Sequence, residues 1–440
     1  MNPGIDTPEG HCVPLSRNRN YQLLWISQVL SGVGLSASVI AFPLLVLALT
    51  GSAAASGLVL GSIAAGQLLA GLPAGALVDR WDRKTIMLSC EATQVIVAAS
   101  LVAALWWDVA QVWHLVVVAV VMGVCAALFR PAEDACLPLV VPAEQLSTAV
   151  ALNAARASVA QLSGTATGGF LFAIGRFVPF LADALAHAVA CALLVFLRVP
   201  PREVRAEPAR HLGREIAAGL RWVWGHRHIR VTALCAVVLN LFFSAFYLIV
   251  IVLAVARGVP SGQVGIMAAM LGVGGLLGAL VASRLSQVLS PFVSIIAVFW
   301  VMAALTPVAA FVHSGYLLGV LLAAMALLPA TANTTIITRQ LLLTPDDLRG
   351  RLSSVLGIVT GVAAVLGPVL GGLLAGAVSG TLAVLVCAGG IAAAAVVATL
   401  SPTLRSFPRH PAVAAQPQAA QPEPEPEPEP EFENERHRGT

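Results

Sequence analysis

Residues Gly75–Lys84 read GALVDRWDRK and form a short charged break between two long apolar segments. The apolar segment Gly57–Val78 ends inside this stretch, and the segment Ile86–Trp107 follows it. Each segment exceeds the roughly 17–20 residues that an α-helix needs to cross a hydrocarbon core ~30 Å thick. Because lipid offers no partner to backbone polar groups, an apolar segment of this length is expected to cross the membrane as a helix.

The composition extends this expectation to the whole chain of 440 residues. Hydrophobic residues make up 58% and charged residues 11%, whereas about 25% of the residues of a soluble domain are charged. So few charges cannot cover a water-facing surface, which disfavours a large soluble protein with buried helices. We therefore predict an all-α polytopic membrane protein with twelve transmembrane helices. The predicted spans lie near residues 21–49, 57–78, 85–107, 112–138, 147–173, 177–198, 230–256, 262–285, 291–312, 316–341, 351–377 and 380–400.

The chain also repeats itself at one constant offset. A shift of 203 residues lays Gly75–Val78 onto Gly278–Val281 and Gly164 onto Gly367. A constant offset predicts two pseudo-symmetric six-helix halves with parallel topology. The predicted division comprises a cytoplasmic N-terminus (1–20), a first half (21–198), a cytoplasmic linker with an amphipathic helix (199–229), a second half (230–401) and a disordered cytoplasmic tail (402–440).

The positions of the basic residues predict the orientation in the membrane. Cytoplasmic loops of membrane proteins carry an excess of Lys and Arg. If both termini are cytoplasmic, the predicted outer loops hold only Arg176 and Arg257. The predicted inner segments then hold Arg17, Arg19, Arg80, Arg83, Lys84, the arginines of the linker, Arg284, Arg339, Arg349, Arg351 and Arg405. We expect a multi-pass protein of the plasma (inner) membrane.

Two polar segments are expected to have simple structures. In the linker, Leu212, Ile216, Leu220 and Trp224 recur every fourth residue. This spacing predicts an amphipathic helix, either on the inner membrane surface or packed against the rest of the protein. Proline and glutamate alternate over Pro422–Glu431, a composition that predicts an extended, disordered tail.

The GALVDRWDRK stretch resembles the loop signature G-x-x-x-D-R-x-G-R-[RK] between helices 2 and 3 of the major facilitator superfamily. Asp82 stands where the signature has its second glycine. That variant resembles the drug–proton antiporter branch, which contains macrolide-efflux and enterobactin-export proteins. The resemblance implies a latch in which Asp79 contacts the start of the eleventh helix and a cation near the inner end of the fourth, here Arg130, while the outward side is open. The alternative is a basic loop that only sets topology. The latch residues would be Gly75, Asp79, Arg80, Arg83, Lys84 and Arg130.

Two further stretches resemble the same superfamily. Leu366–Gly372 resembles the G-P-x-x-G-G element of helices that pack between the two halves. Its counterpart Gly164–Gly169 keeps the glycines but has Thr165 in place of the proline. Phe129–Leu146 resembles the P-A…L-P-x-L-V-P run of the exporter branch. The resemblance implies packing between the halves by Gly164, Gly168, Gly367, Pro368 and Gly371.

Several ionisable residues fall inside predicted spans, where each is costly unless paired or hydrated. Arg130, Glu133 and Asp134 are spaced i, i+3 and i+4, which places both acids beside the arginine on one helical face. They are expected either to relay protons or compete for substrate cations, or to form a self-neutralised latch. Arg156, in the middle of the fifth span, needs a counter-ion, which Glu133, Asp134 or a substrate anion would supply.

A second candidate proton site lies on the sixth span. Asp183 and His187 are spaced i, i+4, and histidine changes its charge near neutral pH. The pair is either a proton-coupling site or a structural contact of this helix. Glu91 lies about 9 Å into the third span at 1.5 Å per residue, and we expect it to reach the cytoplasmic surface in a structural role. The predicted proton-coupling residues are Glu133, Asp134, Asp183 and His187.

The resemblance also implies that helices 1, 4, 7 and 10 line a central cavity. Aromatic and neutral hydrogen-bonding residues on these spans suit an amphipathic or hydrophobic solute, although any one aromatic side chain could instead face lipid. The predicted cavity residues are Gln28, Ser31, Arg156, Asn240, Phe243, Phe246, Tyr247 and Asn333.

These observations favour a secondary transporter that exports a small molecule in exchange for protons. An importer or uniporter of the same superfamily is the alternative. An ATP-driven pump is disfavoured because a P-loop needs G-K-[ST], whereas Lys84, the only lysine, follows Arg83. Neither HExxH nor GxSxG occurs, and the seven cysteines form no CxxC pair. We expect no catalytic residue, cofactor, metal or nucleic-acid partner; the expected partners are a small-molecule substrate, protons and the lipid bilayer, and the chain is expected to be a monomer.

Overall fold

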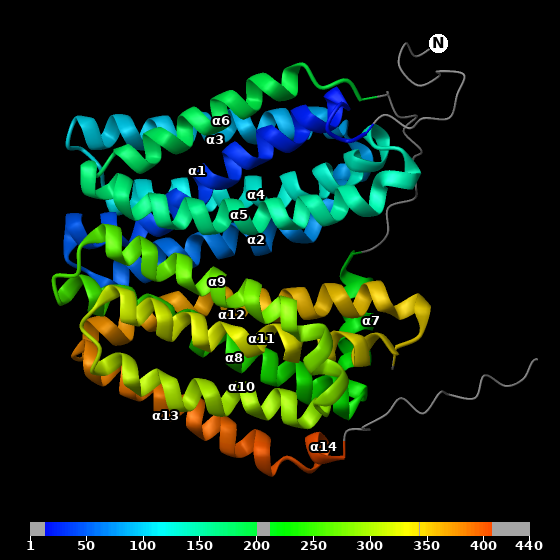
Figure 1. The fold of residues 1–440 in the computed structure, drawn as a ribbon, viewed down its shortest axis with the longest axis vertical. Coiled ribbons are helices and arrows are strands. Elements are labelled where there is room, and N and C mark those ends of the chain that lie inside the picture. The colour runs from blue at the N-terminus through cyan, green and yellow to red at the C-terminus, as the bar shows by residue number, and fades with distance from the viewer. Residues whose placement is uncertain (1–13, 200–211, 343, 407–440) are drawn as a thin grey trace, which may run out of the picture.

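The structure, a computed structural model, describes residues 14–199, 212–342 and 344–406. Over these ranges the chain forms helices joined by short connections (Figure 1). The first half consists of α1 (Arg19–Thr50), α2 (Ala53–Arg80), α3 (Arg83–Trp106), α4 (Val112–Val140), η1 (Ala143–Gln145), α5 (Leu146–Ile174) and α6 (Val178–Val195). Then follow α7 (Leu212–Gly225), α8 (Arg227–Ala256), α9 (Ser261–Val288), α10 (Pro291–Leu305), η2 (Thr306–Ala310), α11 (Gly315–Leu342), α12 (Asp346–Ala377), α13 (Gly380–Leu400) and α14 (Pro402–Arg405).

The long helices coincide with the predicted spans to within a few residues. Eleven of the described helices are long and apolar enough to cross a membrane. The twelfth long helix, α5, has 29 residues but is less apolar, because it carries Arg156 and many Ser, Thr and Gly residues. Helices α1–α6 pack into one bundle and α8–α13 into a second, as Figure 1 shows. The fold is the predicted arrangement of two six-helix halves.

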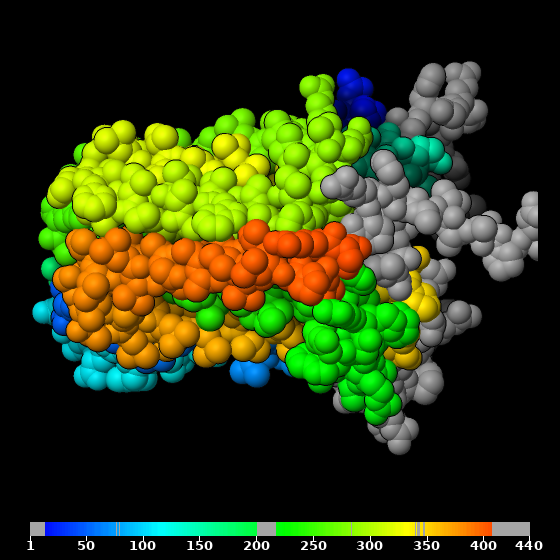
Figure 2. Space-filling model, turned by 90° about the horizontal axis from the view of Figure 1, so that it is seen from below, coloured from blue at the N-terminus to red at the C-terminus, as the bar shows by residue number. Residues whose placement is uncertain are grey.

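Much of the outer surface is apolar, as a lipid-facing surface must be. Figure 2 shows the face of the second half that α13 (orange) forms with α10 beside it. Among its exposed side chains are Val293, Trp300, Leu382, Leu385, Val386, Val397 and Leu400.

The two ends of the bundle differ in charge. Helix α1 begins, and α14 ends, at the right of Figure 1, where α7 also lies. We call this the basic end, because the helix termini there carry Arg80, Arg83, Lys84, Arg227, Arg230, Arg284, Arg349, Arg351 and Arg405. At the opposite, far end, the described cations are Arg176 and Arg257.

Close helix packing at the far end joins the two halves through glycine. A Cβ on Gly372 of α12 would lie 2.5 Å from the Ala53 carbonyl oxygen of α2, and a Cβ on Gly265 of α9 would lie 2.7 Å from the Ala166 carbonyl oxygen of α5. Such approaches exclude any larger residue, since small residues let helices pack closely where lipid gives no hydrophobic drive. The α2–α12 and α5–α9 contacts are therefore equivalent across the two halves.

The glycines expected between the halves mostly pack within them, and this expectation was wrong. A Cβ on Gly168 would lie 2.6 Å from the Ala37 carbonyl oxygen of α1. A Cβ on Gly371 would lie 2.5 Å from the Ala245 carbonyl oxygen of α8. Gly164 likewise contacts α1, and Gly367 contacts α8. Successive helical residues point about 100° apart, so the neighbouring Gly169 and Gly372 face the other half instead.

Of the five predicted inter-half residues, Pro368 does contact the other half. Its carbonyl oxygen lies against Gly57 of α2.

Towards the basic end, α2 and α12 separate. A wedge-shaped cavity of about 400 Å³ lies between them, lined by Gln67, Leu68 and Gly71 on α2 and by Arg351, Ser354 and Gly357 on α12, among others. A Cβ added to Gly71 or Gly357 would meet no atom within 4 Å. The halves are thus in close contact at the far end and apart at the basic end.

Helix α7 packs against α12. Its Gly219 lies against the Arg351 carbonyl oxygen, and Val223 is buried with Leu352 and Val355. Leu220 and Trp224 are exposed by 44% and 63%, so half of the predicted apolar stripe faces outward. The side chains of Leu212 and Ile216 lie outside the described residues. The helix therefore packs on the bundle while still offering apolar side chains on its outer side.

The first residues of the predicted disordered tail are helical, so that expectation was wrong for residues 402–405. Residues 402–405 form α14, in which Thr403 and Leu404 are buried. Residues 407–440, including Pro422–Glu431, lie outside the described residues. Residues 1–13 of the N-terminus lie outside them as well.

Replacing Gly372 by alanine should destabilise the protein. The new Cβ would meet backbone atoms of Ala53 and Gly57, which cannot move aside cheaply, and overpacking typically costs about 1–3 kcal/mol. The matched control is Gly389→Ala on α13, where a Cβ meets nothing within 4 Å. We expect a lower midpoint of thermal unfolding in detergent for Gly372→Ala only; equal midpoints for the two variants would contradict the assigned contact.

Candidate functional site

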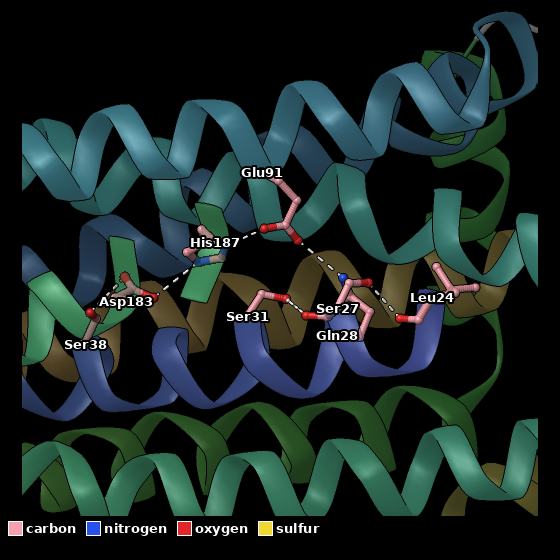
Figure 3. Close-up of polar contacts among 8 residues, drawn as sticks. All are labelled: Leu24, Ser27, Gln28, Ser31, Ser38, Glu91, Asp183 and His187. Atoms are coloured by element: carbon pink, nitrogen blue, oxygen red, sulfur yellow. Dashed lines mark hydrogen bonds and ion pairs between the residues drawn. The ribbon is translucent and has the colours of Figure 1, made fainter. Parts of the chain in front are cut away.

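Three ionisable side chains meet inside the first half, as Figure 3 shows. The His187 ring on α6 lies between the Glu91 carboxylate on α3 and the Asp183 carboxylate one turn earlier on α6. His187 Nδ1 lies 2.6 Å from Glu91 Oε2, and His187 Nε2 lies 3.2 Å from Asp183 Oδ1. All three side chains are 1% exposed. Their charges therefore have to be balanced inside the protein.

Helix α1 supplies the remaining hydrogen bonds of both acids. Gln28 Nε2 donates to Glu91 Oε1 over 3.3 Å, and Ser38 Oγ donates to Asp183 Oδ2 over 2.9 Å. Gly34 makes room for the second acid, because a Cβ there would lie 2.7 Å from Asp183 Oδ1. Gln28, Ser38, Glu91, Asp183 and His187 form one connected group (Figure 3), which we call the acid–imidazole network.

The sequence predicted part of this network. The Asp183–His187 contact follows from their i, i+4 spacing and is present. Glu91 was expected to reach the cytoplasmic surface, and this was wrong: it is 1% exposed and bound to His187. The ion pair and the Gln28 bond compensate for its burial. Its partner lies 96 residues away, so no local spacing could have indicated the contact.

The network cannot be electrically neutral unless it holds two protons. With both carboxylates ionised and a protonated imidazole, its net charge is −1. A second proton, on either acid, brings the charge to zero, and a net charge inside hydrocarbon is costly. The nearby Cys125 of α4 and Cys191 of α6 are thiols and add no positive charge.

A separate ion pair joins α4 and α5. Arg156 Nη2 lies 2.8 Å from Glu133 Oε1, and both side chains are 8% exposed. Glu133 is therefore the counter-ion of Arg156. It is one of the three alternatives that the sequence left open. The Tyr21 hydroxyl of α1 is buried beside this pair and has no hydrogen-bond partner among the described residues.

The expected cluster of Arg130, Glu133 and Asp134 does not form. Arg130 and Asp134 are exposed, and within the described part of the chain Glu133 pairs with Arg156 instead. The helical spacing placed both acids near Arg130. Glu133 instead points towards α5, where the buried Arg156 needs a counter-ion.

Two of the predicted latch residues connect helices of the first half. Arg83 Nη1 donates to the Ala135 carbonyl oxygen of α4 over 2.7 Å. Lys84 Nζ donates over 2.8 Å to the carbonyl oxygen of Val195, the last residue of α6, where a cation also favours the helix dipole. The hydrogen bonds of these two cations thus lie within the first half, and their part in a latch between the halves stays a prediction.

The other latch residues give less information. Arg80 is exposed, and a Cβ on Gly75 would meet no atom within 4 Å. The side chain of Asp79 lies outside the described residues, so its contact with Arg130 or α12 stays a prediction.

A cavity of about 440 Å³ lies between α5 of the first half and α8, α9, α10 and α11 of the second. Three of the predicted substrate-cavity residues, Asn240, Phe243 and Asn333, line it. Ser158 and Gln161 of α5 also line it. These two were not predicted, because the resemblance implied a cavity lined by helices 1, 4, 7 and 10, whereas this one lies beside α5.

The other predicted cavity residues have different environments. Gln28 belongs to the acid–imidazole network, and the buried Ser31 hydroxyl donates to the Ser27 carbonyl oxygen of its own helix over 2.9 Å. Arg156 is occupied by Glu133. Phe246 is fully buried in the core of the second half, and Tyr247 packs against that core. An apolar helix offers aromatic side chains on several faces, and the sequence does not show which face meets the cavity.

The comparisons with known proteins agree with this fold. A family model described as transmembrane secretion effector, of the major facilitator superfamily, matches residues 10–439. The chain belongs to this family. It is a membrane transporter of the major facilitator superfamily, in the efflux-type branch that the loop signature indicated.

Curated relatives of this transporter carry efflux names. Macrolide efflux protein A of Enterococcus faecalis is 27% identical over 127 residues, which cover 29% of this chain and 39% of the relative. Multidrug efflux pump Tap of Mycobacterium bovis is 26% identical over 235 residues, which cover 51% of this chain and 55% of the relative. The MFS-type transporter YceJ of Bacillus subtilis is 26% identical, with coverage of 57% and 62%. The matched parts thus span about two fifths to three fifths of these relatives.

Solved structures share the fold of this transporter. The nucleoside transporter NupG (D323A mutant) has a TM-score of 0.73 at 11% identity, covering 86% of this chain and 98% of that one. A bacterial homologue of the iron transporter ferroportin, in the inward-facing state, has a TM-score of 0.66 at 17% identity, with coverage of 88% and 98%. At these identities the likeness shows the fold alone.

Removing one partner of the Glu133–Arg156 pair should destabilise the transporter more than removing both. Arg156→Gln leaves a buried carboxylate without its counter-ion, which typically costs about 3–5 kcal/mol. The double variant Glu133→Gln/Arg156→Gln should recover much of this loss, because two neutral amides can bond to each other. Thermal unfolding of both single variants and the double variant measures the difference. Additive losses would show that the pair contributes no mutual stabilisation.

Proposed function

We propose that this transporter exports a small amphipathic or hydrophobic molecule, and that proton entry drives the export through alternating access. The observation that carries the proposal is the acid–imidazole network: a buried group in the spanning part of the first half whose charge can change by gain or loss of a proton. A proton that drives transport must rest on such a group while the protein changes conformation.

The distribution of charge supports the orientation. The basic end carries most of the described cations, and basic loops favour the cytoplasm. In that orientation both termini and the linker are cytoplasmic, and the protein lies in the plasma membrane. The wedge between α2 and α12 then opens towards the cytoplasm. The structure corresponds in this proposal to the state that takes up solute from inside the cell.

The glycines of α2 and α12 support an alternating mechanism. Gly57 and Gly372 are in close contact at the far end, whereas Gly71 and Gly357 have free space near the basic end. Closing the wedge would bring these last two, which carry no side chain of their own, towards the opposite helix. Asp79 and Arg130 would then be in position to act as the predicted latch.

Among the candidate acids, Glu91 and Asp183 are better placed to bind the coupling proton than Glu133 and Asp134. Glu133 is neutralised by Arg156 at 2.8 Å, and Asp134 is exposed. The network, in contrast, holds two acids against a single base. Only there does charge balance call for an additional proton.

The direction of transport rests on the efflux names of the relatives, since proteins of this fold also move solutes inward. An importer is the second candidate, and the cellular accumulation of a substrate distinguishes them. Cells that produce an exporter accumulate less of it than control cells, and cells that produce an importer accumulate more.

We expect Glu91→Gln and Asp183→Asn each to abolish proton-driven transport. The assay is uptake into inverted membrane vesicles under an imposed pH gradient, with the compound against which the transporter protects cells best. Losing a proton-binding acid should lower gradient-driven uptake by roughly tenfold or more, the change that 1.4 kcal/mol produces. The matched control is Glu144→Gln, which changes an exposed acid of η1 and should leave uptake unchanged.

Glu133→Gln and Asp134→Asn are measured in the same vesicle uptake assay. If both network variants retain gradient-driven uptake while either of these two loses it, the coupling proton binds on α4 and not in the network. Retention by all four variants would mean that none of these acids carries the coupling proton.

A further inference from the structure

The cavity in the second half has the size of a ligand site. Its volume of about 440 Å³ falls within the roughly 300–1,000 Å³ of pockets that bind drug-sized molecules. Four of the five helices that line it, α8–α11, belong to the second half, and α5 closes the side towards the first. Leu239, Phe243, Leu271 and Met302 supply much of its apolar wall.

Among the described residues that line this cavity, none carries an acid, amine, guanidinium or imidazole group. Its polar side chains are the amides of Gln161, Asn240 and Asn333 and the hydroxyl of Ser158. Asn240 Nδ2 donates to the Ala236 carbonyl oxygen over 2.8 Å, and Ser158 Oγ donates to that of Ala154 over 3.2 Å, so both oxygens can still accept. Gln161 and Asn333 are exposed towards this space. The walls can therefore exchange hydrogen bonds with a solute but cannot neutralise a charge on it.

The buried ion pairs described above lie away from this cavity. The two contacts in the network and the Glu133–Arg156 pair belong to the first half. The network is built from α1, α3 and α6, and no helix contributes to both the network and the cavity. The five helices that line the cavity carry no acidic residue, and Arg156 of α5 is already paired with Glu133. A cationic solute in the cavity would thus have no counter-ion there, and burying an unpaired charge is strongly unfavourable.

We infer that this cavity binds an uncharged solute that carries hydrogen-bonding groups. This solute site is separate from the residues that bind the proton. The inference rests on the proposed export function and adds the chemical class of its substrate and the location of the site. Solute and proton then do not compete for the same side chains. Each half contributes one of the two sites, despite the symmetry of the backbone.

The test compares two uncharged probes, chloramphenicol and linezolid, with two permanent cations, tetraphenylphosphonium and ethidium. Growth inhibition is measured in an efflux-deficient host that produces the full-length transporter. We expect protection against the uncharged probes and none against the cations. An unpaired charge in such a site should weaken binding by more than about tenfold.

Two matched variants locate the site. Gly275 lines the cavity, and a Cβ there meets no atom within 4 Å, so Gly275→Phe fills the space without striking the backbone. Gly389→Phe makes the same change on the exposed surface of α13. We expect Gly275→Phe to lose protection and Gly389→Phe to keep it, at equal amounts of protein in the membrane. If Gly275→Phe does not reach the membrane, Gly275→Leu replaces it, with a partial loss expected.

A third variant tests the charge argument directly. Asn333→Asp places a carboxylate in the cavity wall and should confer protection against the two cations. Wild-type protection against the cations, or undiminished protection by Gly275→Phe, would overturn this inference while leaving proton-driven export intact. Protection against neither class of probe would contradict the export function itself.

Discussion

A charge inside a membrane protein must be paired, and in this transporter that constraint is met by one histidine between two acids. The 2.6 Å contact of His187 with Glu91 joins α3 to α6, and the hydrogen bonds from Gln28 and Ser38 bring α1 to the same place. Gly34 on α1 is the local adaptation that admits Asp183. Three helices thus depend on one group, whose two acids outnumber its single base. In the proposed function, the imbalance that makes the group costly in a fixed charge state is what lets it exchange a proton.

The two halves share a backbone design but divide the chemistry. Equivalent glycines join α5 to α1 and α12 to α8, and the neighbouring glycines join α5 to α9 and α12 to α2. Helices α5 and α12 therefore each contact both halves at once. Helix α5 lies between α1, which carries two members of the network, and α9, which lines the cavity. In the proposed mechanism, a movement of α1 on proton exchange would reach the cavity through its packing against α5, although the two sites share no residue.

The sequence alone predicts the parts of this structure that depend on local pattern. Apolar length gave the spans, the 203-residue offset gave the two halves, and i, i+4 spacing gave the Asp183–His187 contact. Contacts between distant helices could not be predicted from the sequence. Glu91 contacts a partner 96 residues away, and the residues next to Glu91 do not show which way its side chain points. The glycine elements were recognised, but a difference of one residue decides which half a glycine faces. Phe246 was predicted to line the cavity, but it is buried in the core. The sequence of an apolar helix does not show which of its faces meets the cavity.

The central claim is that a carboxyl group of the network carries a proton. Infrared spectroscopy of the purified transporter in lipid observes the C=O stretch of protonated carboxyl groups directly. The account predicts a carboxyl band in the wild type that is lost in Glu91→Gln or Asp183→Asn but kept in Glu133→Gln. A band that persists unchanged in both network variants, or no such band in the wild type, would contradict the assignment of proton binding to Glu91, Asp183 and His187.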